Sequence, residues 1–207
     1  MSAIAEAGAA SAATIRLLFR DHACLSGDLS LSGEELERNL SLVFFGGIST
    51  VEALILNALA NLLPRPDLRV RLHSEPQLLP RILEETMRWS GPVQSATRHA
   101  TRNIQLGDAI IEEGETVNCM LASANRDESV FDRADMFDPD RTGVSRYLGF
   151  AAGPHHCLGA HLARLEAATL ISTLLRQFPD VALLEPSTID IRGHEFRQPT
   201  RLRCSLG

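Results

Sequence analysis

The cysteine at position 157 lies in the segment whose residue types most clearly suggest chemistry. Gly153 precedes it, Gly159 follows it, and a strongly helical stretch begins directly afterwards. Backbone amides at the start of a helix stabilise a thiolate, and the two glycines allow the backbone to turn tightly and approach a flat ligand. Phe150 offers an apolar wall that would keep water from the sulfur. A thiolate held in this way suits a soft or borderline metal such as haem iron.

Two other interpretations of this segment stay open from the residues alone. A lone cysteine is most often a small buried hydrophobic residue. Alternatively, Cys157 could bind zinc together with His155, His156 and His161. Zinc sites usually take paired ligands from two separate places in the chain, and the sequence offers no second pair.

The longest predicted helix begins at a capping box, in which Ser32 accepts from the amide of Glu35 and Glu35 reaches back. It extends for about 45 Å to residue 63, and two prolines, at 64 and 66, end it. Its second part is long and apolar enough to resemble a membrane span. Polar residues interrupt that run, namely Ser49, Thr50, Glu52, Asn57 and Asn61. We therefore expect a buried helix through the centre of the protein.

The rest of the chain is predicted to contain shorter elements. Apolar spacing and breaking residues predict helices over 67–73, 77–89 and 158–178. Apolar runs bounded by glycine predict strands over 104–106, 109–111 and 116–119, with another near 202–205. Residues 125–147 are rich in Asp and Arg and are expected to form an ordered meander with little regular structure. The predicted fold is mainly α with a small antiparallel β-sheet, an α+β arrangement.

The overall composition excludes several classes of function. The chain has 207 residues and a net charge of −6, and it lacks the basic stripe of a nucleic-acid-binding protein. Its cysteines are scattered without the spacing of a disulfide framework, which favours a reducing cytosol. The N-terminus lacks the basic start and apolar core of a signal peptide. We expect a cytoplasmic protein that binds neither nucleic acid nor membrane.

The segment around Cys157 resembles the haem-binding loop of the cytochrome P-450 family, whose pattern is F-G-x-G-x-H/R-x-C-x-G. The matching positions are Phe150, Gly153, His155, Cys157 and Gly159. Ala151 stands in place of the first glycine, a change that adds a methyl group and is not expected to abolish binding. The resemblance implies haem b as the cofactor and Cys157 as its axial metal ligand.

Glu85 and Arg88 lie three positions apart on the helix predicted over 77–89, so their charges share a face and can pair. Taken alone, such a pair is most simply a solvated surface contact. The pair matches the E-x-x-R of the same family, however, and Arg141 matches a third member in the meander. The resemblance implies a buried structural triad that locks the meander beneath the cysteine loop.

The stretch Gly46-Gly47-Ile48-Ser49-Thr50 resembles the family's oxygen-binding segment, A/G-G-x-D/E-T. A glycine inside a helix costs about 1 kcal/mol relative to alanine, so a pair indicates either close approach to a haem face or tight helix packing. Thr50 matches the residue that is implied to hydrogen-bond dioxygen and guide its protons. Ser49 stands where the family has an acidic residue. Serine cannot relay protons as a carboxylate does, although a bound water could compensate.

Arg98 and His155 match two positions that bind haem propionates in the family. Charge-assisted hydrogen bonds to carboxylates suit both side chains, although an exposed surface position is the simpler interpretation of Arg98. The resemblance covers residues 29–207 and corresponds to the C-terminal half of a family member. We accordingly expect residues 1–207 to form a single partial domain, with 1–28 as a leader or the remnant of a helix.

The resemblance implies a haem-thiolate monooxygenase, or its haem-bearing part, that activates dioxygen to oxidise a small organic substrate. The sequence shows no flavin or nicotinamide motif, so electrons would come from a separate ferredoxin or flavoprotein reductase. Arg141, Arg146 and Arg164 could meet an acidic partner electrostatically. Two alternatives stay open, namely a truncated remnant without activity and a haem enzyme that uses peroxide.

Overall fold

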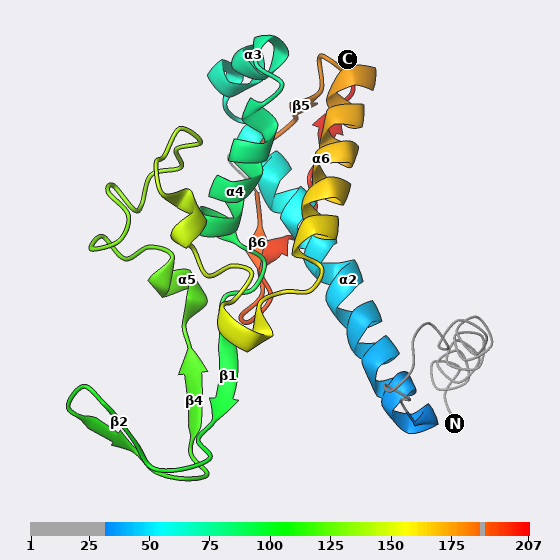
Figure 1. Cartoon of the computed structure of the whole chain (residues 1–207). Coiled ribbons are helices and arrows are strands. Elements are labelled where there is room, and N and C mark those ends of the chain that lie inside the picture. Colours follow the sequence, from blue (N-terminus) through cyan, green and yellow to red (C-terminus); the bar gives the residue numbers. More distant parts are fainter. Residues whose placement is uncertain (1–31, 187–188) are drawn as a thin grey trace. The chain divides into compact units, whose positions relative to one another are not determined.

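The computed structural model of the chain describes residues 32–186 and 189–207 (Figure 1). These residues belong to two compact units, 1–49 and 50–207. The described part of the first unit is the beginning of one helix, whereas the second unit contains the remaining elements and the hydrophobic core. The segment 1–28, expected to be a leader or helix remnant, lies outside the described residues.

Helix α2 spans Gly33–Leu62 and begins at the predicted capping box. The amide of Ser32 donates to Glu35 Oε2 at 2.8 Å, and the amide of Glu35 donates to Ser32 Oγ at 3.3 Å. The hydrogen bond from the Ser32 amide lowers the pKa of the Glu35 carboxyl group. The capping box is therefore confirmed, and the helix ends within one residue of the predicted boundary.

The expectation that this helix is buried along its length is wrong for its first part. Within the first unit, large apolar side chains are exposed, including Leu42, Val43, Phe45 and Ile48. By length and composition alone, residues 37–62 would be long and apolar enough to cross a membrane. A core helix can have the same length and composition, and in the second unit α2 is such a helix, since Leu54, Ala58 and Leu62 are all buried.

Two of the polar residues that interrupt this part of α2, Asn57 and Asn61, are buried and hydrogen-bonded, whereas Glu52 is exposed. The side-chain amide of Asn57 donates to the carbonyls of Ser90 and Arg197, at 2.7 and 3.1 Å. The amide of Asn61 donates to Ser90 Oγ at 2.8 Å. Within the second unit, these contacts tie α2 to the end of the next long helix and satisfy groups that would otherwise be costly to bury.

The other helices of the second unit are α3 Pro66–Ser74, α4 Leu78–Ser90, the single turn α5 Leu121–Ala124 and α6 Ala160–Gln177, with 3-10 turns η1 Val144–Arg146 and η2 Gly153–His155. Helices α4 and α6 lie side by side (Figure 1). Their facing sides and the end of α2 form the core, which includes Leu62, Leu78, Ile82, Leu83, Ala167 and Ile171. Helix positions predicted from apolar spacing are confirmed to within a few residues.

The strands form antiparallel pairs. β1 Ala96–His99 pairs with β4 Thr116–Cys119, and β2 Ile104–Leu106 pairs with β3 Ala109–Ile111 at the far end of that ladder (Figure 1). Near the C-terminus, β5 Ala182–Leu183 pairs with β8 Cys204–Ser205, and β6 Ile191–Arg192 pairs with β7 Gln198–Pro199. Strand β1 was not predicted, because Thr97-Arg98-His99 lacks apolar alternation. The predicted α+β class is confirmed.

Candidate functional site

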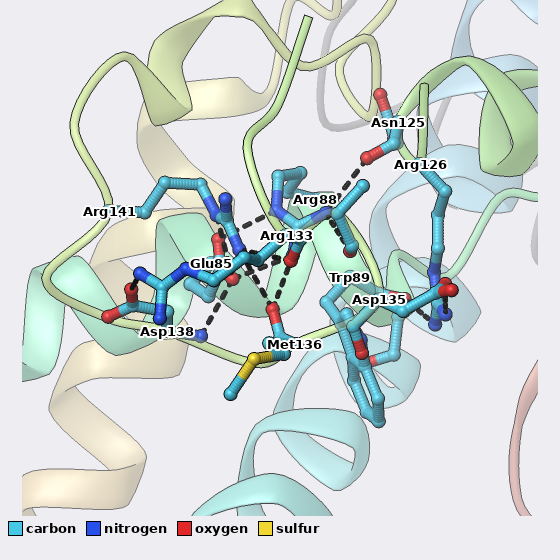
Figure 2. Close-up of polar contacts among 12 residues, drawn as sticks. Glu85, Arg88, Trp89, Asn125, Arg126, Arg133, Asp135, Met136, Asp138 and Arg141 are labelled. Carbon is cyan, nitrogen blue, oxygen red and sulfur yellow. Dashed lines mark hydrogen bonds and ion pairs between the residues drawn. The ribbon is translucent and has the colours of Figure 1, made fainter. Parts of the chain in front are cut away.

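A buried carboxylate in the second unit, Glu85, is paired with two guanidinium groups (Figure 2). Glu85 and Arg88 lie on α4 and are both fully buried. Arg88 binds the carboxylate in a bidentate manner, with Nε 2.8 Å from Oε2 and Nη2 2.7 Å from Oε1. Arg141 places its Nε 3.2 Å from the same Oε1. The structure thus brings together the three residues singled out from the sequence, and the pair on α4 is not a solvated surface contact.

The two guanidinium groups also bind the backbone of the meander. Arg88 has five N–H donors, and those not used by Glu85 donate to carbonyl oxygens at 2.8–2.9 Å, namely those of Asn125, Ala134 and Met136. Arg141 donates to the same carbonyl of Met136 and to two further ones, those of Asp132 and Arg133. Glu85 in turn accepts the amide of Asp138 at 2.8 Å. Side chains therefore satisfy backbone groups that no helix or sheet supplies with partners.

Asn125 connects this cluster to the segment that leads into the cysteine loop. It is buried, its carbonyl accepts from Arg88 at 2.9 Å, and its side-chain Oδ1 accepts the amide of Leu148 at 2.7 Å. Leu148 lies two residues before Phe150. Asn125 was not predicted, since an asparagine in a polar meander gives no sign of its burial.

Cys157 lies in a tight loop between η2 and α6. Its amide donates to the carbonyl of Phe150 at 2.8 Å, and its own carbonyl accepts the amide of Ala160 at 3.3 Å. Helix α6 begins at Ala160, two residues later than predicted, because Leu158 and Gly159 belong to the turn. The Cys157 side chain is exposed, which excludes the interpretation of this cysteine as a buried hydrophobic residue.

The surroundings of Cys157 offer one metal ligand rather than several. The described residues, which include all three neighbouring histidines, contain no group of three or more His, Cys, Asp or Glu side chains able to share a metal ion. Zinc needs such a group, whereas haem brings its own equatorial nitrogen ligands and takes an axial ligand from the protein. A Cβ added at Gly159 would lie 4.0 Å from the Cys157 sulfur, and one added at Gly153 would meet open space. Leu158 is 93% exposed. The residues around Cys157 therefore suit a group that takes a single ligand from the protein better than they suit a zinc ion.

Ala151 has a backbone conformation that disfavours alanine. Its φ is +58°, in the left-handed region, where a Cβ costs roughly 1–2 kcal/mol. The substitution for the family's glycine therefore adds strain as well as a methyl group. Ala151→Gly is expected to raise the free energy of unfolding by about 0.5–1 kcal/mol, after allowing for the extra freedom of glycine in the unfolded chain. Urea unfolding of the two proteins measures this difference.

The adjacent alanine provides the control for this prediction. Ala152 has an extended backbone, with φ −148°, so Ala152→Gly should lower stability by roughly 0.5–1 kcal/mol. Equal destabilisation by both substitutions would show that Ala151 is not strained.

A second polar cluster, which was not predicted, lies beside the cysteine loop. Arg164 on α6 binds Glu84 on α4, with Nε 2.5 Å from Oε1, and the Tyr147 hydroxyl donates to Glu84 Oε2 at 2.8 Å. Burial raises the pKa of Tyr147, and the nearby charge of Glu84 raises it further. The hydrogen bond to Glu84 also raises the pKa of Arg164. These residues lie 63 and 80 positions from Glu84, and no local pattern announces the contact.

The remaining predicted residues are accessible or lie on α2. Arg98 lies on β1 and His155 on η2, and both are exposed. Ser49 is the last residue of the first unit and is exposed, and Thr50 is the first residue of the second unit and is half-buried.

The proposed surface for an acidic partner needs correction. The Arg141 side chain is only 5% exposed, and Arg164 is engaged by Glu84. Arg146 is the member of that set that is exposed. Arg141 is therefore too buried to meet a partner, whereas Arg164 is partly exposed but already paired within the chain.

Comparison with known proteins gives a consistent result. The family described as Cytochrome P450 matches residues 11–191. Cytochrome P450 126 of Mycobacterium tuberculosis is 44% identical over 158 residues, which cover 76% of this chain and 38% of that protein. Cytochrome P450 107B1 of Saccharopolyspora erythraea is 40% identical over 154 residues, covering 74% of this chain and 38% of that protein.

Solved structures agree with the sequence matches. Cytochrome P450 CREJ, in complex with (4-ethylphenyl) dihydrogen phosphate, matches with a TM-score of 0.82 and 29% identity, over 92% of this chain and 50% of that one. P450BioI, in complex with an acyl carrier protein ligated to hexadec-9Z-enoic acid, also matches with a TM-score of 0.82, at 31% identity over 93% of this chain and 52% of that one. The chain spans about half of these structures, and less than half of the curated relatives, 38% in the two cases above. The family match, the relatives and the shared fold show that the chain belongs to the cytochrome P-450 family, whose cofactor is haem b.

Proposed function

We propose that residues 29–207 form the haem-binding half of a haem-thiolate monooxygenase, with the sulfur of Cys157 as the axial ligand of the iron. The observation that carries this proposal is the exposed thiol of Cys157, held in a hydrogen-bonded loop just before α6. Haem bound through a thiolate supplies oxygen-activating chemistry.

Other residues of the chain would orient this group. Arg98 and His155, both exposed, can donate charge-assisted hydrogen bonds to propionates. Gly159 keeps side-chain atoms away from the sulfur, since a Cβ at this position would lie 4.0 Å from it. Glu85, Arg88 and Arg141 would act at a distance, since they hold the meander whose end continues into the cysteine loop.

The proposal includes partners and a substrate class. Electrons would come from a separate ferredoxin or flavoprotein reductase, and Arg146 is an exposed cation that an acidic partner could meet. The substrate would be a small organic molecule. Because the matched relatives are bacterial proteins, the expected location of this protein is the cytoplasm.

Ser49 favours a second candidate function, peroxide-driven oxidation. The hydroxyl of Thr50 can hold a proton at Oγ1, but Ser49 lacks the carboxylate that would renew it. Peroxide already carries the protons and electrons that the dioxygen route must import. The peroxide route therefore depends less on a proton relay. Positioned proton transfer contributes roughly 10²–10⁴-fold to a rate, which makes the two routes separable by experiment.

Ser49→Asp is expected to raise the reductase-driven oxidation of a small chromogenic aromatic probe by about 10²-fold if the relay limits the rate. The peroxide-driven rate should change little, since it does not use the same relay. Initial rates by both routes, at matched haem content, measure the effect. Thr50→Ala in the Ser49→Asp background should reverse the gain.

Each outcome of this comparison bears on one candidate. Reductase-driven turnover of the unaltered protein supports the monooxygenase, and turnover with peroxide alone supports the second candidate. Bound haem without turnover by either route would indicate a truncated remnant, as would purification without haem.

A further inference from the structure

Glu84, Tyr147 and Arg164 form a closed ring of hydrogen bonds. Arg164 contacts both carboxylate oxygens of Glu84, with Nε 2.5 Å from Oε1 and Nη2 3.1 Å from Oε2. The same Nη2 lies 3.0 Å from the Tyr147 hydroxyl oxygen, and that hydroxyl donates to Glu84 Oε2 at 2.8 Å. A bidentate guanidinium–carboxylate pair is both strong and geometrically specific. The ring therefore sets the position of the Arg164 guanidinium.

Because its own position is fixed, Arg164 in turn restricts the side chain of Phe150. Its guanidinium carbon lies 4.4 Å from the centre of the Phe150 ring, a cation–π contact. The Tyr147 ring lies 6.2 Å from the same ring, within the range of favourable aromatic pairs. Phe150 is 8% exposed. Two contacts of different kinds thus hold this buried aromatic side chain in place.

Phe150 is joined directly to the backbone of the candidate ligand. Its carbonyl accepts the amide of Cys157 at 2.8 Å, which closes the loop between them. A displacement of Phe150 would therefore lengthen or break this hydrogen bond and move the sulfur.

We propose that Glu84, Tyr147 and Arg164 are positioning residues that set the orientation of Cys157 through Phe150. This inference rests on the proposed role of Cys157 as an iron ligand. It gives the two adjacent carboxylates of α4 separate tasks, because Glu85 holds the meander and Glu84 holds the cysteine loop. Groups that orient a metal ligand usually affect metal binding although they do not touch the metal.

The test compares Arg164→Gln with a matched variant on α4, Arg81→Gln. Arg81 also forms ion pairs, with Asp140 at 2.6 Å and Glu75 at 3.5 Å, and its side chain is 42% exposed. Both variants remove one cation with carboxylate partners, but Arg81 has no role in the proposed network. Hydrogen exchange of the Cys157 amide should be faster in Arg164→Gln and unchanged in Arg81→Gln, when both are measured under conditions in which the proteins are folded.

The haem-loaded protein provides the second readout. Arg164→Gln should release haem to an acceptor protein about tenfold faster, and a smaller share of its reduced carbon monoxide complex should show the long-wavelength band of thiolate ligation. Arg164→Lys keeps the charge but not the fork or the stacking, so it should not restore either property. Glu84→Gln should act in the same direction, and the double variant with Arg164→Gln should be no worse than the more severe single variant.

The outcomes separate this inference from the proposed function. An unaltered protein without the long-wavelength band would overturn both. A normal band and haem release in folded Arg164→Gln, with an unchanged Cys157 amide, would overturn the positioning role alone. Equal changes in Arg81→Gln would also overturn the positioning role, because they would show that loss of any paired cation on this part of the protein has the same effect. Should Arg164→Gln fail to fold, Glu84→Gln and Tyr147→Phe decide the question by the same measurements.

Discussion

Replacing Cys157 with alanine is expected to abolish the long-wavelength Soret band of the reduced, carbon monoxide-treated protein. A thiolate axial ligand donates electron density to the iron, and alanine supplies no ligand at that position. Haem affinity should fall by more than the roughly 10- to 100-fold that follows loss of a group that only supports a ligand. Absorption spectra at matched protein concentration, with haem titration, measure both effects. Cys157→His offers a second ligand type and should retain haem without the long-wavelength band.

Cys119→Ala is the control for this prediction. Cys119 is exposed on β4, as Cys157 is in its loop, so both substitutions remove an accessible thiol. The spectrum of Cys119→Ala should equal that of the unaltered protein. A long-wavelength band that persists in Cys157→Ala would assign the iron to another residue and overturn the proposed site.

Local sequence was sufficient to predict the elements that local interactions determine. The capping box needs only Ser32 and Glu35, and both hydrogen bonds are present. Helices α3, α4 and α6 follow from apolar spacing and from the breaking residues at their ends. The cysteine loop was also predicted to precede a helix, because Cys157 and its neighbouring glycines lie within a few positions of one another.

Features set by tertiary contacts were not predictable in the same way. Strand β1 exists because Arg98 and its neighbours pair with β4, although only Thr97 among them is a residue type that favours strands. The strain at Ala151 depends on a backbone angle that residue type does not reveal. The contacts of Arg164 with Glu84 and Tyr147 join separate elements, so spacing along the chain carries no sign of them. For the same reason Arg164 was assigned to a partner surface.

The cluster on α4 shows how a pattern can identify residues and still leave their environment undecided. Spacing placed Glu85 and Arg88 on one face of a helix, which is equally typical of a surface pair. Their burial follows from the position of α4 between α6 and the meander. The number of backbone carbonyls that Arg88 holds was not predictable, because those of Asn125, Ala134 and Met136 lie 37–48 positions away.

Arg88→Met is expected to lower the free energy of unfolding by about 3–5 kcal/mol, since it removes one partner of a buried ion pair and leaves Glu85 without most of its compensation. The free energy of unfolding of small proteins is about 5–15 kcal/mol. This single substitution could therefore remove most of the stability of the protein. Urea unfolding followed by far-ultraviolet circular dichroism measures the loss. Arg88→Lys serves if Arg88→Met does not fold, because lysine keeps the charge but cannot present five donors in a planar fork.

A double substitution distinguishes an unpaired buried charge from a general loss of packing. Glu85→Leu with Arg88→Met removes both charges, and the combined loss should be clearly smaller than the sum of the two single losses. Arg81→Gln, on the exposed side of the same helix, should cost no more than about 1 kcal/mol. If the loss in the double variant equalled the sum of the two single losses, the attraction between the two charges would contribute nothing, and only the packing of the two side chains would matter. The meander would then be held by the carbonyl contacts of Arg88 and Arg141, and the buried carboxylate of Glu85 would contribute little to its stability.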